Sequence, residues 1–370
     1  MPGRVCALCC LVLLEIPASI AAAVPALVRT LPTGEFEVAV LRPDGSSLAV
    51  TPQGVIRQNA AGSQRYVARL RGNQNAVLAR HGSTFGVTTF ADNAPATLHA
   101  AAFDLYDESG TRLFRLEKPE ATEFVISEDG RWVVGIAGGD EMRESKLHLF
   151  DAKGAEVTTW NVSYLSDLTL PAGGTRFFAA SRGVLQAYSY MGGEPHPFGR
   201  FEAFGLGAGG RYVALCGAGS VALYQEEKLV FTAPSEISQP RSVAVSPDGK
   251  SIGVAGEDRL ELFDCEKGTR VCTVTSGRPD LRFVSLDLGG GADAILAGLD
   301  CDPGAAAETP RHTSGAVFLL NREGQLLWRD DFQYTTWNAR VPAVRFLASP
   351  GRIEVELASE IRSYSLPERP

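Results

Sequence analysis

Short apolar runs separated by polar turns recur along the chain, and the clearest unit begins at Arg241 with RSVAVSPDGKSIGVAG. The turn Ser246-Pro247-Asp248-Gly249 contains the Pro and Gly that tight turns favour. The apolar runs on either side of this turn are short, and a third run, at 259–263, alternates between apolar and polar residues. The unit therefore predicts four antiparallel strands, at 243–245, 251–255, 259–263 and 270–274.

Variants of the first hairpin of this unit recur eight times, each with a glycine in its turn. The spacing of 36 to 60 residues lies around the period of propeller blades. Eight hairpins predict an all-β fold, a β-propeller of eight four-stranded blades, with a seven-bladed ring as the alternative. The turn glycines are Gly45, Gly82, Gly130, Gly174, Gly210, Gly249, Gly291 and Gly351.

The two ends of the predicted propeller are complementary. The last unit ends at about 364–366 after only three strands, and the run 26–31 precedes the first complete unit. Since an exposed sheet edge invites aggregation, we expect this N-terminal run to pair in the last blade as its outer strand and close the ring.

The first 23 residues have the features of a signal peptide. Arg4 precedes an apolar run at 5–14, and the small residues at 21–23 provide a cleavage site. A retained membrane helix and lipidation at Cys9 or Cys10 are the alternatives. No later stretch reaches the roughly 18 consecutive apolar residues that a span needs. We therefore expect 1–23 to be removed, 24–370 to form one propeller domain without a membrane span, and the protein to be periplasmic or secreted.

Composition and charge narrow the class of partner. The 370 residues include 45% apolar residues and 39 glycines, which suits a large core with many tight turns. The formal net charge is −8, without a cluster of Lys and Arg, so no nucleic-acid partner is expected.

Four cysteines remain after residue 23: Cys216, Cys265, Cys272 and Cys301. Cys265 and Cys272 flank a predicted turn, so they could lie opposite each other on paired strands and form a disulfide. Buried free thiols are the alternative. No CxxC pair or histidine spacing predicts a metal site.

Two hairpins resemble known propeller repeats. SPDGKSIGV resembles the WD40-like repeats of the TolB family, and LLNREGQLLWRDDF resembles PQQ-type repeats. Resemblance to PQQ enzymes would imply a quinone, a bound cation and an acidic base. After residue 23 the chain has no adjacent cysteines, and only Trp160 and Trp328 occupy the expected tryptophan positions. We therefore expect no cofactor, as in the cofactor-free propeller of the outer-membrane assembly machinery.

Function on a propeller resides in its loops. Three links between second and third strands are long, at 90–100, 138–146 and 298–315, and all fall on the face that also carries the predicted inter-blade segment 331–341. We call this the long-loop face. Its charged and aromatic residues are candidates for cation, charge or hot-spot contacts: Asp140, Glu141, Arg143, Asp300, Asp302, Tyr334 and Trp337.

The sequence contains no nucleophile elbow or reactive-cysteine motif. The pattern favours a non-enzymatic exported scaffold that binds a protein, peptide or glycan through the long-loop face. The alternative is a lactonase- or lyase-type enzyme with carboxylates or a metal at the mouth of the central funnel.

Overall fold

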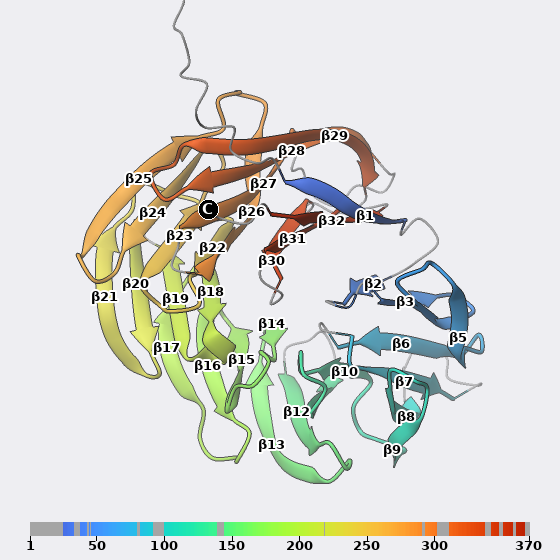
Figure 1. Ribbon diagram of the computed structural model, residues 1–370. Helices are drawn as coiled ribbons and strands as arrows, with labels where there is room; N and C mark the ends of the chain where they lie inside the picture. Colours follow the sequence, from blue (N-terminus) through green and yellow to red (C-terminus); the bar gives the residue numbers. More distant parts are fainter. Residues whose placement is uncertain are drawn as a thin grey trace, which may run out of the picture.

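The structure is a computed structural model that describes residues 25–32, 38–42, 44, 46–79, 82–91, 100–138, 144–217, 219–290, 293–301, 311–336, 342–347, 351–357 and 360–366. The expected signal peptide lies outside these residues. Eight four-stranded antiparallel sheets form a ring around a central axis (Figure 1), which confirms the eight-bladed propeller. Within the described ranges, no helix is long and apolar enough to cross a membrane.

We number the blades 1 to 8 along the chain and give their strands from the axis outward. Blade 1 has β2 (Val38–Leu41), β3 (Ser47–Thr51), β4 (Gly54–Gln58) and β5 (Gln64–Arg69). Blade 2 has β6 (Gln74–Leu78), β7 (Thr84–Phe90), β8 (Ala100–Asp107) and β9 (Arg112–Glu117). Blade 3 has β10 (Glu123–Ile126), β11 (Trp132–Gly138), β12 (Glu144–Asp151) and β13 (Glu156–Ser163). Blade 4 has β14 (Leu165–Thr169), β15 (Arg176–Ser181), β16 (Val184–Ser189) and β17 (His196–Arg200).

The second half of the ring repeats this order. Blade 5 has β18 (Ala203–Gly207), β19 (Tyr212–Gly217), β20 (Ser220–Gln225) and β21 (Lys228–Pro234). Blade 6 has β22 (Ser242–Val245), β23 (Ser251–Ala255), β24 (Arg259–Asp264) and β25 (Thr269–Thr275). Blade 7 has β26 (Arg282–Leu288), β27 (Ala294–Asp300), β28 (Arg311–Asn321) and β29 (Leu326–Thr336). Blade 8 has β30 (Ala343–Phe346), β31 (Arg352–Glu356), β32 (Glu360–Ser365) and β1 (Ala26–Pro32).

Blade 8 confirms the predicted closure. β1 pairs antiparallel with β32, from Ala26 opposite Ser365 to Pro32 opposite Glu360. The N-terminal strand thus covers the outer edge of the last blade, and Figure 1 shows it beside β32.

The turn glycines follow the prediction with one exception. Gly82, Gly130, Gly210, Gly249 and Gly351 all have positive φ, between 64° and 83°. In blade 4 the left-handed residue is Gly173, at φ 65°, and not Gly174 as the pattern suggested. Gly45 and Gly291 lie outside the described residues.

In every blade the pairing of the third and fourth strands has one register shift, a β-bulge in the outermost strand. The register shift leaves one fourth-strand residue without a partner opposite it, and this residue is apolar in all eight blades. Because a bulge increases the local twist, its repetition twists the outer edge of every blade. The bulge residues are Val28, Val67, Leu113, Val157, Phe198, Val230, Val271 and Leu327.

Seven clusters of buried apolar side chains hold the ring together, one at each interface between blades adjacent in sequence. At the interface of blades 5 and 6, for example, Leu223 packs with Val254 and Phe263. In the described part of the chain no such cluster joins blade 8 to blade 1. We call this eighth interface the seam.

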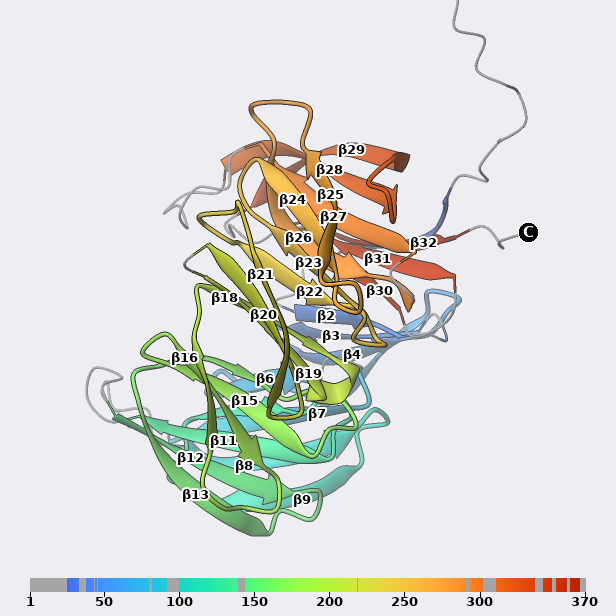
Figure 2. The same ribbon diagram turned by 90° about the vertical axis from the view of Figure 1, so that its left-hand side faces the viewer.

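Blade 7 corrects the predicted inter-blade segment at 331–341. Its first six residues belong to β29, which pairs with β28 as far as Thr336 opposite Arg311. β27 ends at Asp300, opposite Gly315 of β28. The ends of β28 and β29 therefore extend beyond β27 as a two-stranded ribbon on the long-loop face, and Figure 2 shows these strands from the side.

The suggested disulfide is not formed. All four described cysteines are free thiols. The bulge shifts the register so that Cys272 lies opposite Leu262, whereas Cys265 follows the end of β24. Cys265 packs into the core between blades 5 and 6, and Cys272 packs into the core between blades 6 and 7. The two thiols therefore lie on opposite faces of blade 6.

Candidate functional site

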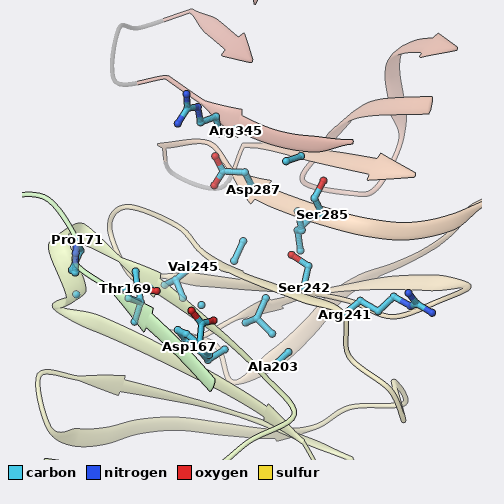
Figure 3. A pocket seen from close by; sticks show the side chains of 18 of the residues that line it. Asp167, Thr169, Pro171, Ala203, Arg241, Ser242, Val245, Ser285, Asp287 and Arg345 are labelled. Atoms are coloured by element: carbon cyan, nitrogen blue, oxygen red, sulfur yellow. The ribbon is translucent and has the colours of Figure 1, made fainter. Parts of the chain in front are cut away.

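A cavity of about 790 Å³ lies at the axis of the ring. It is lined by the innermost strands of blades 4 to 8, which are β14, β18, β22, β26 and β30, and by the 3-10 turn η2 (Ala208–Gly210). Figure 3 shows Arg241 at one end of the cavity and Arg345 with Asp287 at the other, with Ser242 and Ser285 between them. A volume of this size falls in the range of ligand pockets.

Small residues let the inner strands approach one another closely. A Cβ atom on Gly205 of β18 would lie 2.3 Å from the carbonyl oxygen of Val243 in β22, so only glycine fits there. Ala203, Ser242 and Ala244 also line the cavity. Because each inner strand is the edge of its sheet, the cavity wall presents backbone N–H and C=O groups between short side chains.

The end of the cavity on the long-loop face carries a charge cluster. Arg241, which precedes β22, donates to Glu257 Oε1 at 2.6 Å, and Arg282 at the start of β26 donates to Glu257 Oε2 at 3.0 Å. The hydrogen bond from Arg241 holds the pKa of Glu257 below its usual range. Two guanidinium groups therefore share the carboxylate of Glu257, and the charge of Asp258 also acts on it.

Carboxylates further along the cavity tie neighbouring blades together. Asp287 of blade 7 accepts the backbone N–H of Phe346 in blade 8 at 2.6 Å. Glu128, in blade 3, accepts the N–H of Ala172 in blade 4 at 3.0 Å. Arg345 forms an ion pair with the buried Glu354 of the same blade. These groups hold the blades in place around the cavity.

The structure describes two of the seven residues that the sequence suggested for the long-loop face, and the other five lie outside the described residues. Asp140, Glu141, Arg143, Asp302 and Trp337 lie outside the described residues.

Two candidates are described, and both are buried. Asp300 ends β27, is fully buried and accepts the hydroxyl of Thr313 at 2.7 Å. Tyr334 lies in β29, only 6% exposed, and packs with Phe332 in the core between blades 7 and 8. Neither lines the axial cavity. Asp300 and Tyr334 therefore act within blade 7, and the structure does not bring them to the funnel mouth.

The groups that line the cavity were missed by the sequence analysis. Arg241, Ser242, Ser285, Asp287 and Arg345 come from the innermost strands or the residue before one. Their signal was present in the first strand of each repeated hairpin, which is the strand that faces the axis.

The described ranges contain no metal cluster, and three of their thiols have a raised pKa. They contain no group of three or more His, Cys, Asp or Glu side chains placed to hold a metal ion. Burial raises the pKa of Cys216 and of Cys265 to about 12 and also raises that of Cys272. Such thiols stay protonated near neutral pH and are weak nucleophiles.

Comparison with known proteins finds the fold in solved structures only. No protein-family model matches the chain, and no curated protein matches it in sequence. The crystal structure of BamB from Moraxella catarrhalis is similar over 92% of this chain and 100% of that one, with a TM-score of 0.58 and 14% identity. The C-terminal WD40 domain of Sif2 is similar over 93% and 99%, with a TM-score of 0.56 and 8% identity.

Kluyveromyces lactis Hsv2p covers 77% of this chain and 89% of its own, with a TM-score of 0.51 and 10% identity. At these identities the likeness shows the β-propeller fold.

Proposed function

We propose that this protein is an exported, non-catalytic scaffold that binds a polypeptide on its long-loop face, at the mouth of the axial cavity. The observation that carries the proposal is the cavity itself. Its wall contains the edges of five inner strands, with small side chains among larger apolar ones, and its mouth bears the Arg241–Glu257–Arg282 cluster. Polypeptides bind to strand edges through backbone hydrogen bonds, with little need for large side-chain pockets.

The two-stranded ribbon of blade 7 is a second reason to place the binding site on the long-loop face. Arg311–Ser314 of β28 pair with Gln333–Thr336 of β29 beyond the end of β27. Within the described residues no third strand pairs with the ribbon at this point, so it offers a further strand edge on the long-loop face. Three of the carboxylates that line the cavity, Glu128, Asp167 and Asp287, already accept backbone N–H groups. This engagement favours a binding site over an acid–base site.

Site-specific crosslinking in the producing cells tests the proposal. A photoreactive residue at Ser242, at the mouth, or at the exposed Gln333, on the ribbon, is expected to give discrete protein adducts. The same residue at exposed Lys250, in the turn on the opposite face of blade 6, is the matched control and is expected to give none. Equal adducts from both faces, or adducts that only a glycosidase removes, would contradict a polypeptide site on the long-loop face.

A bulky substitution gives an independent readout. We expect Ser242→Trp to fill the mouth and abolish recovery of the crosslinked partner, whereas Lys250→Trp leaves it unchanged. Normal recovery with Ser242→Trp would remove the cavity from the proposal. Export is tested separately by sequencing the N-terminus of protein recovered outside the cytoplasm, where the expected first residue is Val24.

A further inference from the structure

The common bulge allows the eight blades to be compared residue by residue. In each blade, one third-strand residue pairs with the fourth-strand residue that follows the bulge. In blades 1 to 7 this third-strand residue is buried Val or Leu, and it packs into the core shared with the next blade. These residues are Val55, Leu105, Leu149, Leu185, Leu223, Leu262 and Leu319.

Blade 8 breaks this pattern. The equivalent residue is Ser363, which is 1% exposed, and its partner on β1 is Arg29. Both residues line the seam with blade 1, which lies on the right of the ring in Figure 1, where β1 and β32 come next to β2 and β3. The seam is thus polar at the position where the other seven interfaces are apolar.

A cavity of about 410 Å³ occupies the seam. Arg29 Nη2 donates to Gln58 Oε1 of blade 1 at 2.7 Å. The other terminal nitrogen of Arg29, Nη1, and the hydroxyl of Ser363 are both buried and have no hydrogen-bond partner in the described part of the chain. A buried donor without an acceptor destabilises a protein by about 1–3 kcal/mol, and by more when it is charged. Two such donors in one cavity indicate an absent acceptor.

The electrostatics of the seam favour an anion with a single charge. Burial lowers the pKa of Arg29, and the charge of Asp44 partly opposes this effect. Asp44 Oδ1 is already engaged, since it accepts the N–H of Ser46 at 2.9 Å and its hydroxyl at 2.6 Å. Arg352 also lines the cavity, so two arginines face one carboxylate. One further negative charge would balance this set, whereas a doubly charged phosphate would leave a charge uncompensated.

We propose that the seam between blades 8 and 1 is a binding site for a small monocarboxylate with a short aliphatic chain. The carboxylate accepts hydrogen bonds from Arg29 Nη1 and Ser363 Oγ, and the chain lies against Val28, Ala60 and Ala61, which line the same cavity. A ligand held by both blades closes the one interface that has no apolar core. Binding therefore stabilises the ring. This site is separate from the axial cavity and does not depend on the polypeptide-binding proposal.

Thermal unfolding of the full exported chain tests the site, with sodium hexanoate as the probe and sodium chloride at equal ionic strength as the control. Because a ligand that binds only the folded state stabilises it by mass action, we expect the Tm to rise saturably with hexanoate and not with chloride. Arg29→Gln is expected to weaken binding roughly 10- to 100-fold, as loss of a charged hydrogen bond predicts. Arg65→Gln, an exposed change on β5, is the matched control and is expected to bind normally.

A second variant keeps the test informative if Arg29→Gln fails to fold. Ser363→Leu places in blade 8 the residue type that blades 2 to 7 already have, so we expect it to fold and to lose the saturable response. No saturable rise in the natural protein would overturn the proposal, as would an unchanged affinity in Ser363→Leu. A larger saturable rise with inorganic phosphate than with hexanoate would overturn the assignment to a carboxylate.

Discussion

The third-strand residue that pairs with the residue after each bulge allows a quantitative prediction about stability. Leu223 is 1% exposed in β20 and packs into the core between blades 5 and 6. Leu223→Ala removes three carbon groups, worth roughly 2.4 kcal/mol at about 0.8 kcal/mol each. The cavity left behind adds to this loss, so the free energy of unfolding should fall by about 2–5 kcal/mol.

Leu229 provides the matched control in the same blade. It lies on the outer strand β21 and is 55% exposed, so Leu229→Ala should change the free energy of unfolding by less than about 0.5 kcal/mol. Urea unfolding followed by both circular dichroism and tryptophan fluorescence measures the two variants, with an unchanged m-value as the check. If both leucines cost the same, the inter-blade cores do not hold the ring in the way argued above.

Three further outcomes are expected. Burial raises the pKa of Cys216 and Cys265 to about 12, so iodoacetamide should label these thiols slowly in the native protein at pH 8 and quickly in urea. Mass spectrometry measures the labelling. Rapid labelling of the native protein would contradict the burial of these thiols. The backbone N–H of Lys267 and the guanidinium of Arg322 hold the pKa of Asp264 below its usual range. The stability that the Asp264 carboxylate contributes is therefore present above about pH 4, and it is lost as the pH falls through the pKa of Asp264 in the folded protein. The stability gap between the natural protein and Asp264→Asn should therefore be constant from pH 5 to 7 and shrink in acid, and a gap that widened there would refute this. Deletion of 24–32 should expose the edge of β32 and produce dimers or aggregates in size-exclusion chromatography, whereas a monodisperse monomer would contradict the closure by β1.

The architecture was predictable because the first hairpin of each blade has a strong local signal. Turns such as Ser246-Pro247-Asp248-Gly249 fix the chain reversal whatever the rest of the fold does, and the strand at 251–255 was predicted with its observed bounds. The second hairpins of blades 1, 4 and 5 have less regular turns. β17 even contains Pro197 and was not recognised, and its place as the outer strand of the blade explains why proline is tolerated there.

The site was harder to predict because its residues are brought together by the ring and not by the sequence. Arg241, Asp287 and Arg345 lie about one blade apart in the chain, and only closure places them around one cavity. The long links drew attention to Asp300 and Tyr334, but the extra length of β28 and β29 turned this region into paired strands with buried side chains. A long link in the sequence does not distinguish an open loop from an extended hairpin.

The seam connects the closure of the ring to its chemistry. Seven interfaces join blades that follow each other in sequence, whereas the seam brings the C-terminal strands β30, β31 and β32 beside blade 1 and depends on the long-range pairing of β1 with β32 inside blade 8. The same interface has Ser363 and Arg29 where the others have apolar pairs. Opening the ring at the seam would therefore expose less apolar surface than opening it anywhere else. An interface that depends on closure of the ring and has no apolar cluster among the described residues is the place where a bound ligand would change the stability of the whole ring most.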